Sequence, residues 1–325
     1  MRNWFAALLV LAFLDGAGTA QTPSYPDRPI TIIVTAAAGG VTDVVARAFG
    51  QELSRATGQP VVIENRGGAA HILGAQAVAK ATPDGYTLLI AEAGTFTINP
   101  SIDPNGKLPY DTGKDFIPIS GLVRINQALL ADRTLPVANA ADLIALAEAK
   151  PAQLTYGTAG IGSATHMNMA LFETMAGVKL VPVHYRGAAP ALNDLIGGSI
   201  NLMSVSVGLA LPPARAGQVK LLGIGSAKRL PQAPDVPTVA ESGLPGYQAV
   251  TWFGLFGAAG TPRDVVTTLN AQVQRIFSNP EFRARFLDAQ MFESMAGPPD
   301  EFADFIKSEQ AKWSEVIRAA NIKLE

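Results

Sequence analysis

Cysteine is absent from this chain of 325 residues. Its absence excludes disulfide bonds, thiolate metal ligands and the lipid-modified cysteine that tethers some exported proteins to a membrane. Histidine is scarce as well, because His71, His166 and His184 are the only three and no carboxylate stands beside them at metal-ligand spacing. We therefore expect no metal site, no cofactor and no lipid anchor.

The chain also lacks an excess of charge of one sign. It has 25 Lys and Arg against 27 Asp and Glu, a net charge of −2. Nucleic acids and anionic membranes attract strongly basic surfaces, so neither is an expected partner. Aromatic residues make up only 7% of the chain, whereas glycine and alanine are plentiful. This composition favours helices packed closely on parallel strands over an all-β sandwich.

Long apolar runs are confined to the N-terminus and remain short there. The first twenty residues contain Arg2, an apolar core from Trp4 to Leu14, and small residues ending Gly18-Thr19-Ala20. A core of about eleven residues is too short to cross a bilayer, which needs roughly twenty. The pattern is typical of a secretory signal peptide over residues 1–20, and a buried N-terminal helix is the alternative. We expect an exported chain with no membrane span.

The remaining sequence alternates between apolar β-branched segments and amphipathic helical patterns. Such alternation predicts buried parallel strands covered by helices. The first series has predicted strands at 30–35, 60–64 and 86–91, with helices at 43–57 and 70–81. The second has strands at 154–158, 179–185, 199–205 and 219–225, with helices at 163–176, 188–196 and 208–216. Two series of this kind predict two α/β lobes, each with a mainly parallel sheet.

Two further apolar runs, 116–131 and 247–258, lie between and after the series. An irregular stretch, 99–115, precedes the first run. Three predicted helices follow the second run, at 264–278, 280–289 and 299–320. We expect these helices to pack on the first lobe. We interpret the runs as strands that cross between the lobes and form a hinge. The predicted domains are therefore lobe 1 over 21–125 and 250–325, and lobe 2 over 126–249. A ligand would lie at the carboxyl ends of both sheets in this clamshell, a two-lobe Venus flytrap.

A glycine-rich turn follows the first predicted strand of each lobe and leads into a helix. The turns are Ala36–Asp43 and Gly157–His166. Backbone N–H groups at a helix start, together with the helix macrodipole, favour an anion. Opposed across the crevice, the two turns predict a pincer for a ligand carboxylate, whereas a plain tight strand-to-helix connection is the alternative for either turn. The predicted ligand-binding residues are Ala37, Ala38, Gly39, Gly40, Thr42, Asp43, Thr158, Gly160, Gly162, Ser163, Ala164, Thr165 and His166, together with Thr95 and Ser204.

Two residues near the first turn have two interpretations each. Asp43 either stabilises the first turn of its helix or hydrogen-bonds a ligand hydroxyl, ammonium group or bridging water. His71 ends a third strand-turn unit that begins at Val61, where it either lines the crevice or is a solvated cap residue.

Catalytic motifs are missing. Gly160-Ile161-Gly162 continues to Thr165, where the dinucleotide fingerprint needs a third small residue. No phosphate-binding loop and no Gly-x-Ser-x-Gly nucleophile elbow occurs. Ser163 and His166 are close enough on one helix to touch, although a cap serine and a helix-face histidine explain them as well. We therefore predict a binding protein that is not an enzyme, with a ligand-sensing module for a signalling receptor or an exported α/β hydrolase as alternatives.

Several ordered motifs resemble one family across nearly the whole mature chain. They are Tyr25-Pro26, the Ala-Gly-Gly-x-Thr-Asp turn at 38–43, Val62–Arg66, Pro83–Leu89, Leu108–Asp111, Lys114–Phe116, Tyr185–Gly187 with Ala189–Ala191, and Asp235–Glu241. The chain resembles the Bug-type solute-binding proteins of the tripartite tricarboxylate transporters. The resemblance implies a periplasmic monomer that captures a small organic acid for a membrane permease. It also implies that the turns 37–43 and 158–166 hold the carboxylate, partly through bridging water.

The chain departs from the family pattern at several positions. Thr35 and Val41 stand where proline is usual, and His71 replaces a glycine. The strand Asn201–Ser206 lacks the usual aspartate and carries Ser204 and Ser206 instead. His71 and these serines bear on the surroundings of the ligand's distal end, so a relative's ligand does not transfer directly to this chain.

Overall fold

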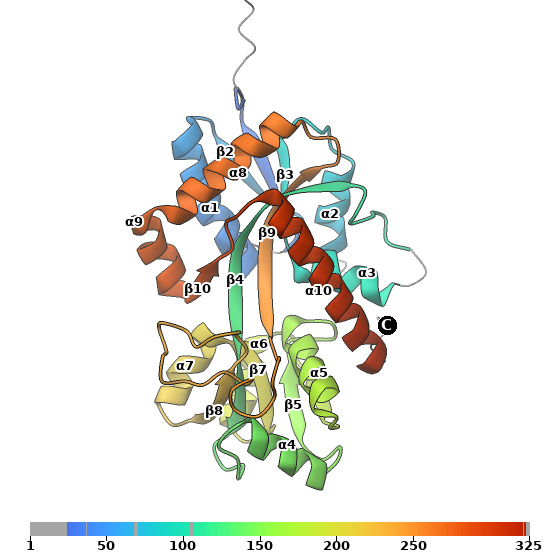
Figure 1. Ribbon diagram of the computed structural model, residues 1–325, viewed down its shortest axis with the longest axis vertical. Helices are drawn as coiled ribbons and strands as arrows, with labels where there is room; N and C mark the ends of the chain where they lie inside the picture. The colour runs from blue at the N-terminus through green and yellow to red at the C-terminus, as the bar shows by residue number, and fades with distance from the viewer. Residues whose placement is uncertain (1–24, 37, 68–70, 104–106, 321, 323–325) are drawn as a thin grey trace, which may run out of the picture.

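The computed structural model describes residues 25–36, 38–67, 71–103, 107–320 and 322. The predicted signal peptide lies outside this range. Two α/β halves lie one above the other and are joined by long strands (Figure 1). Among the described residues, no helix combines the length and the hydropathy needed to cross a bilayer.

The first half begins with β1 (Ile30–Val34), α1 (Val41–Thr57), β2 (Val61–Asn65), α2 (Ile72–Ala79) and β3 (Thr87–Glu92), followed by a π-helix (Gly94–Ile98) and α3 (Asn99–Ile102). The second half contains α4 (Ala140–Ala149), β5 (Thr155–Thr158), α5 (Ala164–Ala176), β6 (Val181–His184), α6 (Ala188–Ile196), β7 (Leu202–Ser206), α7 (Val207–Arg215) and β8 (Val219–Ile224). Strands and helices alternate as the sequence predicts.

Strand order repeats between the halves. β1 lies between β2 and β3 and is parallel to both, and β5 lies between β6 and β7 and is parallel to both. In each half the chain passes from the central strand to the neighbour on one side and then to the neighbour on the other. In open α/β sheets, ligands bind at the carboxyl end of such a central strand, which here is β1 or β5. The two predicted glycine-rich turns follow these two strands.

The two apolar runs expected to cross are β4 (Phe116–Asp132) and β9 (Val250–Ala258). They pair antiparallel from Phe116 with Ala258 to Asn126 with Val250. The last residues of β4 then pair antiparallel with β7 and β8 in the second half. The two-lobe α/β fold predicted from the sequence is confirmed, with a parallel three-strand core in each half and antiparallel strands between them.

Several short elements depart from the sequence-based prediction. The structure adds α4, whose start is capped by the Asn139 side chain accepting from the Asp142 N–H, and β10 (Phe292–Ser294), which pairs with β4. The stretch predicted as irregular from residue 99 opens with α3, and Pro100 suits the first turn of that helix. The helix predicted at 280–289 is α9 (Pro280–Phe282) followed by a π-helix (Arg283–Asp288).

The remaining C-terminal helices, α8 (Arg263–Ser278) and α10 (Pro299–Ala320), cover the first half. A pair of facing glycines, Gly121 on β4 and Gly254 on β9, makes room for the Phe302 ring of α10. A Cβ at Gly254 would lie 2.2 Å from Phe302 Cζ. Neither strand carries a side chain at this pair, so the start of α10 packs directly on the backbone of the sheet.

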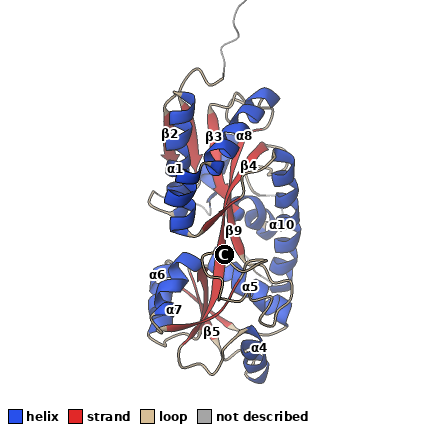
Figure 2. Ribbon diagram, turned by 60° about the vertical axis from the view of Figure 1, so that its left-hand side comes forward, coloured by secondary structure: helices blue, strands red, loops and turns tan. Residues whose placement is uncertain are grey.

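The far end of α10 reaches the second half. Trp313, Val316 and Ile317 belong to the same buried cluster as Met167 and Phe172 of α5. Figures 1 and 2 show the helix running from the upper half down beside α5. The sequence-based expectation placed all final helices on the first lobe, and α10 instead contacts both halves because its apolar stripe continues over its full 22 residues.

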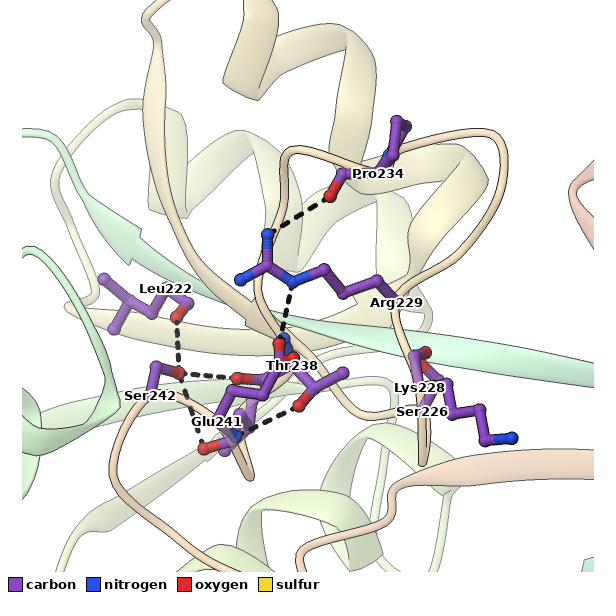
Figure 3. A network of polar contacts seen from close by, with 9 residues as sticks. Leu222, Ser226, Lys228, Arg229, Pro234, Thr238, Glu241 and Ser242 are labelled. Carbon is purple, nitrogen blue, oxygen red and sulfur yellow. Dashed lines mark hydrogen bonds and ion pairs between the residues drawn. The ribbon is translucent and has the colours of Figure 1, made fainter.

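A proline-rich loop returns the chain from β8 to β9. Thr238 and Glu241 form a reciprocal cap, in which the Thr238 N–H donates to the Glu241 carboxylate (2.8 Å) and the Glu241 N–H donates to the Thr238 hydroxyl (3.0 Å). Arg229 lies across the loop, donating to Glu241 (3.0 Å) and to the Pro234 carbonyl (3.2 Å) (Figure 3). The motif Asp235–Glu241 thus fixes the route back to the first half.

We expect Trp313→Ala to lower the free energy of unfolding by about 3–5 kcal/mol, because it removes a large side chain that is 2% exposed and leaves a cavity. Urea unfolding at pH 7 measures the change. Lys307→Ala on the same helix is the control, since Lys307 makes an exposed ion pair with Asp304, and it should change stability by less than about 0.5 kcal/mol. A loss below about 1 kcal/mol for Trp313→Ala would contradict the packing described.

Candidate functional site

The turn after β1 is held by the carboxylate of Asp43. Asp43 Oδ2 accepts from the Gly39 N–H (2.9 Å) and from Arg47 Nε (2.9 Å), and Oδ1 accepts from Asn65 Nδ2 (3.0 Å). Gly39 needs a positive φ of 83° for this turn, a conformation that glycine adopts without strain. Asp43 is 3% exposed, so of its two interpretations the structure supports the stabilising one.

Asp43 is held ionised by these contacts. The hydrogen bond from Arg47 contributes most to lowering the pKa of Asp43 to about 2; burial opposes the shift, and the Gly39 and Asn65 bonds add to it. The same Asn65 amide also donates to the Ala36 carbonyl (3.1 Å). One carboxylate therefore ties the turn, the start of α1 and the end of β2 together.

The turn after β5 is held by hydroxyl groups and an imidazole. The Ala159 N–H donates to Thr165 Oγ1 (2.7 Å), the Gly160 N–H to Thr158 Oγ1 (3.1 Å), and the Gly162 N–H to His166 Nδ1 (3.1 Å). Burial, with a smaller contribution from His184, lowers the pKa of His166 to about 4. His166 is therefore neutral at pH 7, with Nδ1 as the acceptor and Nε2 carrying the proton.

Several of the amides expected to bind an anion are thus used by the chain itself. The N–H groups of the first helical turn have no intrahelical acceptor, and they are the donors left for a ligand. On α5 these are Ala164 and Thr165, because the His166 N–H donates to Ser163 Oγ. On α1 the start has no side-chain cap at Gly40.

A cavity of about 210 Å³ lies between the two halves at the carboxyl ends of the strands. The second half contributes the turn leading into α5, and the first half contributes the end of β3, the helices that follow it, His71 and one residue of β9. The lining residues are His71, Glu92, Ala93, Gly94, Ile98, Asn99, Ile102, Ile161, Gly162, Ser163, Ala164 and Thr251. Among the described residues, no arginine or lysine lines it.

Three of the predicted ligand-binding residues line this cavity: Gly162, Ser163 and Ala164. Thr158, Gly160, Thr165 and His166 lie behind them and support the turn. Ala38, Gly39 and Gly40 are exposed, Thr42 and Asp43 are buried, and none of these five lines the cavity. Ala37 lies outside the described residues.

The two outlying predicted residues are fully or almost fully buried. Thr95, in the π-helix, is 0% exposed, and its hydroxyl finds no hydrogen-bond partner among the described residues. Ser204 lies inside β7 opposite Leu129 of β4. Neither lines the cavity, so a role for either residue in binding stays a prediction.

Glu92 and Thr251 are cavity residues that the sequence prediction missed. Glu92 ends the apolar strand Leu88-Leu89-Ile90-Ala91. A charged residue at the end of a buried strand is the sequence signal that could have identified it as a cavity residue. Thr251 lies inside an apolar run, where nothing distinguishes it from a core residue. His71 lines the cavity, which supports the first of its two interpretations.

No group of three or more histidine, aspartate or glutamate side chains in the described ranges is arranged to hold a metal ion.

Fold, turns and cavity together define a two-lobe binding protein, and comparison with known proteins gives the family. Residues 45–322 match TctC, the tripartite tricarboxylate transporter family receptor. The chain belongs to this family of solute-binding proteins, which are not enzymes, and Bug proteins are among its relatives.

Three relatives illustrate the relationship. The protein BugT of Bordetella pertussis is 32% identical over 96% of each chain. The structure of Rpa4515 of R. palustris with adipate is 34% identical, covers 92% of this chain and 99% of its own, and has a TM-score of 0.78. The structure of MatC from Rhodopseudomonas palustris with bound malate is 35% identical, covers 90% of this chain and 100% of its own, and has a TM-score of 0.74.

We expect Asp43→Asn to lower the free energy of unfolding at pH 7 by about 1–2 kcal/mol, a value reduced by the solvent exposure of Arg47. Because the folded-state pKa lies below the unfolded one, the contribution of Asp43 is complete above about pH 5 and is lost as the pH falls towards 2. The difference from the unmodified protein should therefore shrink between pH 5 and pH 3.

Urea unfolding of both proteins at pH 7, 5, 4 and 3 measures this difference. Asp304→Asn is the matched control, because Asp304 makes an exposed ion pair with Lys307. A difference that stays constant from pH 7 to pH 3 would show that the Asp43 charge is not the stabilising feature.

Proposed function

We propose that this chain is a periplasmic receptor that captures a small organic carboxylate between its two halves and delivers it to the permease of a tripartite transporter. The observation that carries the proposal is the cavity lined from both halves, with the start of α5 on one side and His71 and Glu92 on the other. A ligand in this place would touch both halves at once and so favour their closed arrangement.

The start of α5 supports binding of a carboxylate without any arginine. Ala164 and Thr165 present first-turn amides, and hydrogen bonds to a charged acceptor contribute about 1.5–3 kcal/mol each. The helix terminus adds roughly 0.3–1 kcal/mol. Bonds of this kind, less the cost of ordering the ligand, are compatible with micromolar affinity, about −8 kcal/mol. The ligands in the relatives' structures, adipate and malate, are acids of suitable size.

We assign residues 21–125 and 250–325 to one lobe and 126–249 to the other, with β4 and β9 as the hinge. This division supports capture by closure of the lobes. Removal of residues 1–20 as a signal peptide would release the receptor into the periplasm as a monomer.

Capture without catalysis is supported by the contacts of Ser163 and His166. Ser163 Oγ donates to the Gly160 carbonyl (2.6 Å), and His166 Nδ1 accepts from the Gly162 N–H (3.1 Å). The serine hydroxyl and the imidazole are thus each engaged by the turn, and they do not form the nucleophile–base pair that hydrolysis needs.

We expect Ala164→Leu to weaken carboxylate binding at least tenfold, because the larger side chain would fill part of the 210 Å³ cavity beside the helix start. Thermal shift and calorimetry with mono-, di- and tricarboxylates measure binding. Ala145→Leu, an exposed position on α4, is the control and should bind as the unmodified protein does.

The proposed function fails if no carboxylate in the panel raises the melting temperature of the unmodified protein. The assignment of the cavity fails if Ala164→Leu folds and binds with unchanged affinity.

A further inference from the structure

An ion pair forms the wall of the cavity that faces the start of α5. His71 Nε2 lies 2.9 Å from Glu92 Oε1, and His71 Nδ1 lies 2.9 Å from the Thr35 carbonyl oxygen. Both ring nitrogens thus face an acceptor, which is the arrangement of a doubly protonated imidazolium. Burial lowers the pKa of His71, but Glu92 and the Thr35 carbonyl outweigh it, and the net pKa is raised.

The backbone at His71 is held in an unusual conformation. Its φ is 74°, and the other described non-glycine residues with a positive φ are Ala152 and Met291. Such a conformation costs free energy for a residue with a side chain and is found most often at functional sites. The ring lies beside Gly94, where a Cβ would be 3.5 Å from His71 Cδ2. The turn therefore places the imidazole between Thr35 and Glu92 at the edge of the cavity.

The His71–Glu92 pair can accept hydrogen bonds from a ligand, but its ring N–H groups are already used. Both N–H groups of the His71 ring are used, by Thr35 and by Glu92, so the ring has no donor left for an incoming carboxylate. A carboxylate accepts at about four lone-pair positions, and the contact with His71 uses one of those of Glu92. The His71–Glu92 pair therefore offers a ligand the acceptor oxygens of Glu92 and no ring N–H donor.

No other charged side chain offsets Glu92 here, because His71 and Glu92 are the only ionisable residues among the described residues that line the cavity. A ligand with a carboxylate at each end would place its second negative charge against Glu92, and the one basic residue among the described lining residues, His71, is already paired with Glu92. A ligand with a hydroxyl or ammonium group at that end would instead donate to Glu92.

We propose that His71 and Glu92 select the distal end of the ligand, and that this receptor takes a carboxylate whose other end is a hydroxyl or ammonium group in preference to a second carboxylate. The inference rests on the proposed function, in which the start of α5 holds the first carboxylate. His71 positions and partly neutralises Glu92, and Glu92 makes the contact with the ligand.

Calorimetric titration of the unmodified protein with matched acids tests the inference. The six-carbon series is hexanoate, 6-hydroxyhexanoate, 6-aminohexanoate and adipate, and the four-carbon series is butyrate, 4-hydroxybutyrate, 4-aminobutyrate and succinate. In the series whose length fits, the hydroxy or amino acid should bind at least tenfold more tightly than the diacid. Equal or tighter binding of the diacid overturns the inference.

Glu92→Gln is the matching variant, since it keeps the shape and an acceptor for His71 but removes the charge. We expect it to weaken binding of the amino acid at least tenfold and to strengthen binding of the diacid. Glu64→Gln, at a half-exposed acid on β2 that pairs with Arg66 just beyond the strand, is the control and should change neither. Unchanged ratios in a folded Glu92→Gln protein also overturn the inference.

The two proposals fail in different ways. If no acid of either series and no tricarboxylate binds, the proposed function itself is wrong. If the diacids bind and the hydroxy and amino acids do not, the proposed function stands and the assignment of Glu92 is wrong.

Discussion

The antiparallel pairing of β4 with β9 is the constraint on which the rest of the structure depends. In the part of the chain that the structure describes, β4 is the one strand that pairs in both halves, with β9 and β10 at one end and with β7 and β8 at the other. Its position sets where the carboxyl ends of β1, β3 and β5 meet. The cavity exists because two similar α/β units are attached to the same ladder with those ends facing one another.

The two turns at these ends are stabilised by opposite kinds of chemistry. Asp43 supplies an internal anion to the first turn, whereas hydroxyl groups and neutral His166 stabilise the second. The first turn is therefore already occupied by an anion, the Asp43 carboxylate, which is paired with Arg47, whereas the side chains that hold the second turn are uncharged. A ligand anion is consequently better accommodated at the second turn, and the cavity lies against that turn. Because these bonds are made within the chain, the helix starts are ordered before a ligand arrives, which lowers the cost of binding.

The sequence predicts the fold well because its signals are local. Strand and helix periodicity located β1 to β3 and β5 to β8, and glycine-rich turns located the starts of α1 and α5. α3 and β10 were missed because three or four residues carry no period, and the ten-residue α4 was missed as well. The lining of the candidate cavity was predicted only in part: Gly162 to Ala164 follow from the turn, but the pairing of His71 with Glu92 joins residues 21 positions apart, and no local pattern encodes it. Trp313 resembles any other core residue until its partners on α5 are seen.

Helix α10 adds a third connection between the halves, beside β4 and β9. Its start rests on the glycine pair of the first half, and its end lies in the buried cluster of the second. Two strands alone leave a pair of lobes free to bend and to twist. A rigid rod fixed at both ends along one flank suppresses bending towards or away from that flank, so the remaining freedom is rotation about an axis close to the rod. In such a rotation the two walls of the cavity would slide past one another, with the largest displacement on the flank opposite α10.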